Sequence, residues 1–343
     1  GIVHGRSPYS DRVKATQPAK VFVGTLATRF LVGNRELYMM ASVGISVIPE
    51  GGNDAESLQL TADLAMYRAK SRKTGFAVFE REFNRRSHER FELANALRTA
   101  LALNQFEVYY QPLVRLDDQW LIGVEALLRW YHPRLGRIPP HQFIPVAEET
   151  GLILEIGEWV LRTACLQGVR WLQEGFPPVR IAVNVSAVQF ENPDFEETVA
   201  RCLETTGFPA GLLELELTER VVMSTPETSA VQMKRLRALG LSIAIDDFGT
   251  GYSSLSYLAR LPINILKVDR SFVTGLSETS ANYLIVKAIM GLAEGLQLLT
   301  VAEGIETRAE LDLLRDLGCH RGQGYLFARP SSARAISAMF RMP

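Results

Sequence analysis

The chain runs Ile243-Ala244-Ile245-Asp246-Asp247 in its C-terminal half, a short apolar segment followed at once by two carboxylates. A segment of this length, preceded by a helical stretch at about 227–239, is typical of a buried strand in an α/β protein. Repeats of a strand followed by a helix predict a parallel sheet with helices outside it. About eight such units within about 250 residues favour a closed (β/α)8 barrel, although an open doubly wound sheet has the same alternation.

The elements expected in this sheet occupy the larger, C-terminal part of the chain. Strands are expected to begin near Phe106, Leu121, Arg180, Leu212, Ser242, Ile263, Gln297 and Gly324. Helices are expected at about 140–150, 156–175, 195–206, 227–239, 281–295 and 307–317. Glycines such as Gly207, Gly240 and Gly318 stand where helix C-caps belong.

Polar side chains follow most of the expected strands at the point where each strand ends. They are Glu125, Asn184, Glu216, Glu219, Asp246, Asp247, Asp269, Glu303 and Glu306. In a parallel barrel these strand ends share one rim, where barrel enzymes place their chemistry. Carboxylates that converge there repel one another, and a divalent cation removes that cost. Oxygen ligands without His or Cys favour Mg²⁺ or Mn²⁺, and two ions about 3.5–4 Å apart suit attack on a phosphodiester.

Each of these residues, taken alone, has a plainer interpretation. An acidic residue at a strand end is usually a helix cap or part of a solvated loop, and Asp246-Asp247 before a glycine-rich turn is often only part of that turn. Lys267 could extend its amine to the surface, and Arg129 could form a surface ion pair. Because six segments share the same placement, a metal-dependent barrel hydrolase is as well supported as these interpretations. No substrate follows from the pattern.

The composition limits the class of protein. A length of 343 residues suits two domains, and 47% apolar with 22% charged residues predicts packed globular units. A net charge of -1 argues against a binder of DNA or RNA polymers. The five histidines lack zinc-ligand spacing, and three widely spaced cysteines, Cys165, Cys202 and Cys319, fit a reducing cytoplasm better than a disulfide framework. No apolar run reaches the ~18 residues of a membrane span, and no secretory signal is visible.

Around the polar strand-end residues, the sequence resembles the EAL domain family of bacterial phosphodiesterases, and the match covers about residues 91–330. The Glu-Ala-Leu signature with its trailing Arg-Trp lies in residues 123–130, and the most recognisable loop is residues 246–255. The other matching motifs are Tyr110-Gln111-Pro112, Glu216-Leu217-Thr218-Glu219, Leu266-Lys267-Val268-Asp269, Ala302-Glu303-Gly304-Ile305-Glu306 and Gln323-Gly324-Tyr325. The resemblance implies a (β/α)8 barrel in which one strand is antiparallel.

The resemblance also implies a role for each matched position. The implied ligands of two Mg²⁺ or Mn²⁺ ions are Glu125, Asn184, Glu216, Asp246, Asp247 and Glu303. Lys267 would orient or help to deprotonate the attacking water, so that catalysis depends on Lys267, Asp246 and Glu303. The implied substrate contacts, with the arginine on a phosphate, are Gln111, Arg129, Asp269 and Gln323. Glu219 would touch no metal and would steady the 246–255 loop.

The implied reaction is hydrolysis of one phosphodiester bond of cyclic di-GMP, which opens the ring to linear pGpG. The active form in the family is commonly a homodimer, and the loop after Asp247 is linked to the dimer face. Gly249 and Gly251 give that loop backbone freedom. One departure from the family pattern is Arg220, which follows Glu219 where a small residue such as Ser is usual. Because no metal-ligand position is lost, this departure bears on regulation through the loop rather than on metal binding.

Two other functions remain as alternatives. A receptor that binds cyclic di-GMP without cleaving it typically lacks one or more of the carboxylates, and this chain keeps them all. A scaffold that acts through protein contacts alone would bind no nucleotide.

The N-terminal part has a different pattern. Helices are expected at about 19–30 and 55–73, strands at about 36–47 and 76–79, and a turn at 49–53. Residues 39–79 resemble the C-terminal half of a GGDEF domain, but the Gly-Gly-Asp-Glu-Phe signature is absent and no cyclase activity is expected. We therefore expect a truncated or degenerate α+β GGDEF-like domain at 1–82, a helical linker at 83–103 that includes the start of the barrel, and an EAL domain at 91–343. A membrane tether would belong to an upstream part and not to this chain.

Overall fold

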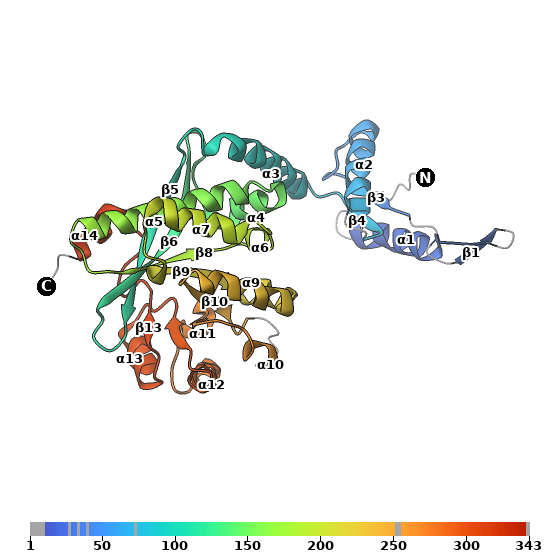
Figure 1. Ribbon diagram of the computed structural model, residues 1–343. Helices are drawn as coiled ribbons and strands as arrows, with labels where there is room; N and C mark the ends of the chain where they lie inside the picture. The colour runs from blue at the N-terminus through green and yellow to red at the C-terminus, as the bar shows by residue number, and fades with distance from the viewer. Residues whose placement is uncertain are drawn as a thin grey trace. The chain divides into compact units, whose positions relative to one another are not determined.

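Figure 1 shows the computed structural model of the chain, which describes residues 11–26, 29–32, 35–38, 41–71, 74–250 and 255–340. The chain divides into two compact units, Gly1–Leu93 and Ala94–Pro343. Parts of four predicted segments lie outside the described residues: residues 27–28 and 72–73 of two predicted helices, the strand positions Met39 and Met40, and residues 251–254 of the loop after Asp247.

The N-terminal unit contains a β-α-β motif and an antiparallel hairpin among its described residues. In the motif β3 and β4 pair in parallel and α2 connects them, whereas β1 and β2 form the hairpin. The helix predicted at about 19–30 begins and ends earlier, and it cannot extend to residue 30 because residues 29–30 pair with β2 in the hairpin. The elements are α1 (Asp11–Leu26), β1 (Arg29–Val32), β2 (Arg35–Tyr38), β3 (Val43–Ile45), α2 (Ala55–Ser71) and β4 (Phe76–Val78).

Helix α2 buries its small side chains rather than its large ones. Ala65 and Ala69 are buried, whereas Leu60 and Tyr67 are 63% and 72% exposed. The cause lies in β3, where a Cβ at Gly44 would lie only 1.8 Å from the carbonyl oxygen of Ala62. The helix therefore approaches the strand closely through small residues. Its apolar period predicts the conformation correctly but not the face that packs on the sheet.

Among the described residues of the C-terminal unit, eight strands close into a barrel. Six neighbouring pairs are parallel, and β5 is antiparallel to both β6 and β13. The closed barrel with one antiparallel strand is therefore confirmed, and an open doubly wound sheet is excluded. The strands around the barrel are β5 (Phe106–Arg115), β6 (Leu121–His132), β8 (Arg180–Asn184), β9 (Leu213–Thr218), β10 (Ser242–Phe248), β11 (Ile265–Val268), β12 (Leu299–Ala302) and β13 (Arg321–Gly322). A further strand, β7 (Gly136–Ile138), pairs with the end of β6.

The last strand lies earlier in the chain than predicted. Gly324, where a strand was expected to begin, lies in a bend after β13. A Cβ at Gly324 would lie 2.1 Å from the carbonyl oxygen of Ile305, so the backbone of the preceding loop occupies that space. The chain turns at this close approach instead of continuing as a strand.

Helices connect most of the strands and lie outside the barrel, where α5 packs beside α7 (Figure 1). Each of the six predicted helices is present within a few residues of its predicted bounds. A single helix, α3 (Arg81–Ala100), covers most of the expected linker at 83–103. The described helices after it are α4 (Pro140–Thr150), α5 (Ile153–Gln173), α6 (Ala187–Phe190), α7 (Phe195–Thr206), α8 (Glu219–Ser224), α9 (Pro226–Ala238), α10 (Leu255–Leu258), α11 (Arg270–Val273), α12 (Ala281–Gly295), α13 (Arg308–Asp316) and α14 (Ala333–Met339).

The barrel interior is apolar one level below the rim. Ala244, Ile265 and Val301 form one buried cluster with Leu113. The first three lie two residues before the strand-end positions 246, 267 and 303, so they point to the same face as those positions. This apolar layer closes the barrel beneath the polar residues of the rim.

A buried ion pair lies further from the rim. Glu214 is two residues before Glu216 in β9, and its Oε2 lies 3.6 Å from the Nη1 of Arg321. The two side chains are only 1% and 11% exposed. Burial raises the pKa of Glu214, and the Arg321 guanidinium opposes that rise. The arginine therefore balances the charge of a glutamate that is buried inside the barrel.

Replacing Arg321 by leucine should therefore destabilise the C-terminal unit in a pH-dependent way. Without the cation, the Glu214 carboxylate is buried and unpaired, and we expect the free energy of unfolding to fall by about 3 kcal/mol near neutral pH. The loss should be smaller at about pH 5, because a carboxyl whose pKa is raised in the folded state stabilises that state only while it is protonated. Urea denaturation at both pH values measures this.

Arg115→Leu is the matched control for this variant. It removes an ion pair with Asp118 in which both side chains are about half exposed, and it should cost less than about 1 kcal/mol. Equal losses for Arg115→Leu and Arg321→Leu would contradict the importance of the buried pair.

Candidate active site

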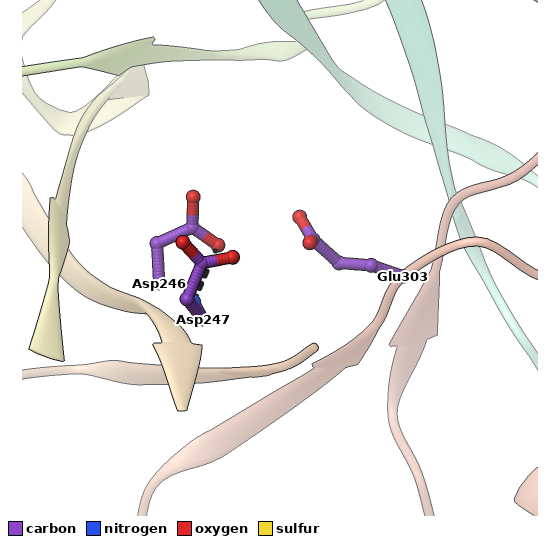
Figure 2. Close-up of side chains that lie close together, drawn as sticks. All are labelled: Asp246, Asp247 and Glu303. Carbon is purple, nitrogen blue, oxygen red and sulfur yellow. Dashed lines mark hydrogen bonds between the residues drawn. The ribbon is translucent and has the colours of Figure 1, made fainter. Parts of the chain in front are cut away.

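Three carboxylates face one another at the barrel rim. Figure 2 shows Asp246 and Asp247, from the end of β10, opposite Glu303, which follows β12. Carboxylate oxygens of the three side chains lie within 4.8 Å of one another. Like charges at this separation are unfavourable unless cations or protons offset them.

Adjacent residues of a regular strand point to opposite faces, so the shared direction of Asp246 and Asp247 needs an explanation. The pairing of β10 with β11 supplies one, because its register shifts between Ile245 and Phe248. From Ile245 to Phe248 the chain advances three residues along β10 while its partner strand β11 advances two, which is the signature of a β-bulge. The backbone of Asp247 has a positive φ of 54° at this point, a conformation that aspartate tolerates better than most residues. The bulge therefore turns both carboxylates toward Glu303.

Lys267 is the cation at the centre of this site. Its Nζ lies 2.6 Å from Glu303 Oε1, 2.8 Å from Glu216 Oε1 and 3.2 Å from Asp246 Oδ1. Although burial lowers the pKa of Lys267, the carboxylates of Asp246, Glu216 and Glu303 raise it well above its usual value. The side chain is 1% exposed, so the interpretation that it extends to the surface is wrong.

Glu125 is held by two side-chain amides. Asn184 Nδ2 donates to its Oε1 at 2.6 Å, and Gln323 Nε2 donates to its Oε2. Gln323 Nε2 also lies 3.3 Å from Gln111 Oε1, and Gln111 Nε2 donates to the carbonyl of Ala328. Burial raises the pKa of Glu125, but Lys267 and the two amides outweigh it, so the net shift is downward. This carboxylate is therefore kept ionised in a buried position.

The pKa values of three other carboxyls are raised. Burial, with the nearby charges of Asp246 and Asp269, raises the pKa of Asp247 to about 6. Burial also raises the pKa of Glu303 to about 8, against the opposing effect of Lys267. Burial raises the pKa of Glu216 well above its usual value, and no donor among the described residues forms a hydrogen bond with its Oε2. Oxygen atoms of this kind, close together and short of positive charge, fit divalent cations such as Mg²⁺ or Mn²⁺.

Glu219 lies beside the rim cluster and contacts the loop after Asp247. Its Oε2 accepts a hydrogen bond of 2.8 Å from the backbone N–H of Gly249, and the residue is 3% exposed. Arg220, the departure from the family pattern, is exposed and leaves this contact in place.

Two of the expected polar residues stand apart from the carboxylate cluster. Arg129 is half-buried on β6, and its Nη1 donates to the carbonyl of Leu128. Among the described residues no carboxylate forms an ion pair with Arg129, so the surface ion-pair interpretation is wrong for that part of the chain. Glu306 is partly exposed and lies 3.8 Å from the Nη2 of Arg270, outside the cluster.

Asp269 takes part in a local cap. Its side chain accepts a hydrogen bond of 2.9 Å from the N–H of Ser271 at the start of α11, while its charge acts on Asp247. Asp269 thus lies at the edge of the cluster, and one of its oxygens already accepts a hydrogen bond from the backbone.

Some residues of the site region escaped the sequence analysis. Glu310 accepts hydrogen bonds from the N–H groups of Gly275, Glu306 and Thr307, and so fixes the loop that carries Glu303. Its Thr-x-x-Glu spacing is that of a capping box and would have identified it. Tyr109 and Tyr131 lie two residues from Gln111 and Arg129 on the same strands, and period-two alternation would have placed them on the same face.

The family model named EAL domain matches residues 94–330, which is more than half of the chain. The chain belongs to the EAL domain family. A second model, diguanylate cyclase, GGDEF domain, matches residues 6–75. EAL phosphodiesterases depend on metals in general, and the rim cluster of Asp246, Asp247 and Glu303 is an acidic group suited to such ions.

Several relatives are similar over most of the chain. The bifunctional diguanylate cyclase/cyclic di-GMP phosphodiesterase MucR of Pseudomonas aeruginosa is 41% identical over 98% of this chain and 49% of its own length. The cyclic di-GMP phosphodiesterase PdeR of Escherichia coli is 37% identical over 91% of this chain and 47% of its own length. The chain therefore spans less than half of the length of either relative.

A solved structure described as the PaMucR phosphodiesterase in complex with c-di-GMP is similar to the barrel unit. It is 46% identical, with a TM-score of 0.69, over 71% of this chain and 99% of that one. In the described part of this chain, no helix is long and apolar enough to cross a membrane.

The raised carboxyl pKa values lead to a prediction for the metal-free protein. Asp247 and Glu303, with pKa values of about 6 and about 8, are protonated in the folded state at pH values where the unfolded chain has lost those protons. Groups with raised pKa values stabilise the fold at low pH and lose that effect as pH rises, so stability should fall between about pH 5 and pH 8.

Added Mg²⁺ should raise the urea midpoint of the EDTA-treated protein, and more strongly at about pH 8 than at about pH 5.5, because the ligands must be deprotonated. Asp247→Asn should weaken this pH dependence. A Mg²⁺ effect of the same size at both pH values would contradict the prediction.

Proposed function

We propose that this chain hydrolyses cyclic di-GMP to linear pGpG with two divalent ions, Mg²⁺ or Mn²⁺. The observation that carries the proposal is the complete set of rim carboxylates, three of which form ion pairs with Lys267. The similarity to proteins named cyclic di-GMP phosphodiesterases supports the choice of substrate. A receptor without catalytic activity is less well supported, because no carboxylate of the set is replaced.

The residues that would hold the ions are those whose side-chain oxygens gather at the rim. We propose Asp246, Asp247 and Glu303 as ligands, because their oxygens already converge. The set is completed by Glu125, Asn184 and Glu216, and Asn184 keeps its Oδ1 available because its amide nitrogen donates to Glu125. When bound, the ions lower the pKa of water and offset charge on the entering and leaving oxygens.

Lys267 is proposed to orient the attacking water. With three carboxylates around it the amine is protonated, so it can donate a hydrogen bond to a water oxygen but cannot accept a proton. Orientation therefore suits the structure better than proton abstraction. The water oxygen attacks phosphorus and gives up one of its protons, the bond from phosphorus to one ribose oxygen breaks, and that leaving oxygen takes up a proton, so that water is added across the bond.

The proposed substrate contacts surround the carboxylate cluster. Arg129 has donors in a fork that matches phosphate oxygens, and no ion pair with a described residue occupies them. Gln111 and Gln323 are buried side by side next to Glu125, and Asp269 lies on the other side near Asp247. Their amide and carboxylate groups can bond the polar edges of a guanine base.

We also propose that the chain forms a homodimer through the EAL domain. Exposed apolar side chains support this: Tyr257 of α10 and Leu284 and Ile285 of α12 are 38%, 70% and 39% exposed. The three free, buried cysteines support a reducing cytoplasmic compartment.

Incubation of the purified chain with cyclic di-GMP and Mg²⁺ or Mn²⁺ tests the proposed activity, with pGpG as the measured product. Glu125→Ala should abolish turnover, by at least about a hundredfold, while the circular dichroism spectrum stays that of the wild type. Tight binding without product would establish the receptor instead. Undiminished turnover by Glu125→Ala would disprove its role as a ligand.

Removal of the Glu219 carboxylate should slow catalysis through the loop it holds. Glu219→Ala leaves the N–H of Gly249 without its acceptor, and turnover should fall about tenfold or more. Glu219→Gln retains an acceptor oxygen and should lose less. Glu227→Ala, at an exposed position of α9, should behave like the wild type. A normal rate for Glu219→Ala would show that the contact is dispensable.

A further inference from the structure

The hairpin of β5 and β6 is longer than the other strands of the barrel. β5 has 10 residues and β6 has 12, and their pairing runs from the rim beside Glu125 outward to Trp130. From Glu125 to Tyr131 the strand advances roughly 20 Å, at about 3.4 Å per residue. The hairpin therefore continues beyond the carboxylate cluster as a wall on one side of the site.

Alternation determines which side chains this wall presents to the site. On β5, Tyr109 shares the face of Gln111, and on β6, Arg129 and Tyr131 share the face of Glu125. The intervening side chains, such as Trp130, are buried on the opposite face, where Trp130 packs against Phe143 of α4. The face with the two tyrosines is thus the one turned away from the helices.

The two tyrosines and Arg129 contact one another. The hydroxyl of Tyr131 donates a hydrogen bond of 2.9 Å to the hydroxyl of Tyr109. The Cζ of Arg129 lies 5.5 Å from the centre of the Tyr109 ring, which is within the range of a cation–π contact. One ring face therefore supports the guanidinium, and a second tyrosine restrains that ring.

The groups around Arg129 leave its positive charge available to bind an anion. Burial lowers the pKa of Arg129, and the nearby cation Arg137 lowers it further. Arg137 pairs with Tyr131 across β6 and β7. In the described chain no carboxylate forms an ion pair with Arg129. Its guanidinium contacts the ring of Tyr109 and the carbonyl of Leu128, and the charge of Glu125 acts on it without an ion pair.

We propose that Tyr109 and Tyr131 are positioning residues that hold Arg129 toward a phosphate of the substrate. The inference rests on the proposed function and names the residues that prepare its phosphate contact. A free arginine side chain loses rotamer entropy when it binds, and a ring that already holds the guanidinium removes part of that cost. The effect should appear in substrate affinity and not in the chemical step, because neither tyrosine contacts the carboxylate cluster.

Initial-rate kinetics with cyclic di-GMP and Mg²⁺ test this through separate KM and kcat values. Tyr109→Phe and Tyr131→Phe should each raise KM about threefold to fivefold, with kcat within about twofold of the wild type. The double variant should match the single variants, because all three lose the same hydrogen bond. Tyr109→Leu also removes the ring and should raise KM by about a further fivefold. Tyr283→Phe on α12 is the matched control and should have no effect.

The decisive comparison uses the Arg129→Gln background. If the tyrosines act through Arg129, their substitution should no longer change KM there, whereas a purely structural hairpin contact would give the same change in both backgrounds. Unchanged KM values for both phenylalanine variants, or equal effects with and without Arg129, would overturn the inference.

The outcome for the wild type separates this inference from the proposed activity. If the wild type binds the dinucleotide without cleaving it, the proposed activity fails, and dissociation constants of the same variants replace KM in the same comparison. If the wild type does not bind the dinucleotide at all, both proposals fall.

Discussion

The rim of this barrel depends on one buried ammonium group. Lys267 Nζ lies within 3.2 Å of oxygens from Glu216, Asp246 and Glu303, which come from three different strands or the loops that follow them. Without that charge the carboxylates would repel one another in a region of low dielectric. The cation and the carboxylates are thus mutually necessary. Because the pKa values of Glu216, Asp247 and Glu303 are still raised, the site has capacity for additional positive charge.

Two local departures from a regular barrel give this site its shape. The bulge in β10 turns Asp246 and Asp247 to one side, although adjacent residues of a strand normally diverge. The antiparallel strand β5 pairs with β6 in a long hairpin that places Tyr109 and Arg129 above the rim. The apolar layer below the rim then separates the site from the buried Glu214–Arg321 pair. Each departure adds a group that a symmetrical barrel would not present.

Two further carboxylates stabilise the site by accepting hydrogen bonds from backbone N–H groups. Glu219 accepts from the N–H of Gly249, and Glu310 accepts from three N–H groups, including that of Glu306. One holds the loop after Asp247 and the other holds the loop after Glu303. Acidic residues therefore serve two purposes at this rim, and the distinction between them is visible only from what each oxygen contacts.

The sequence alone determined the repeated strand and helix units, the positions of the barrel helices and the polar residues at strand ends, because hydrophobic periodicity and turn residues are local properties. It also predicted a barrel with one antiparallel strand through its motifs. Only the tertiary structure decided which groups meet. The small-residue face of α2, the turn at Gly324, the exclusion of Glu306 from the cluster and the burial of Lys267 all depend on chain segments distant in sequence. Contacts of that kind carry no periodic signal. In the barrel they arise from closure, which brings β5 beside β13 and places β10 and β12 on either side of β11, and in the N-terminal unit they arise from the close packing of α2 on β3.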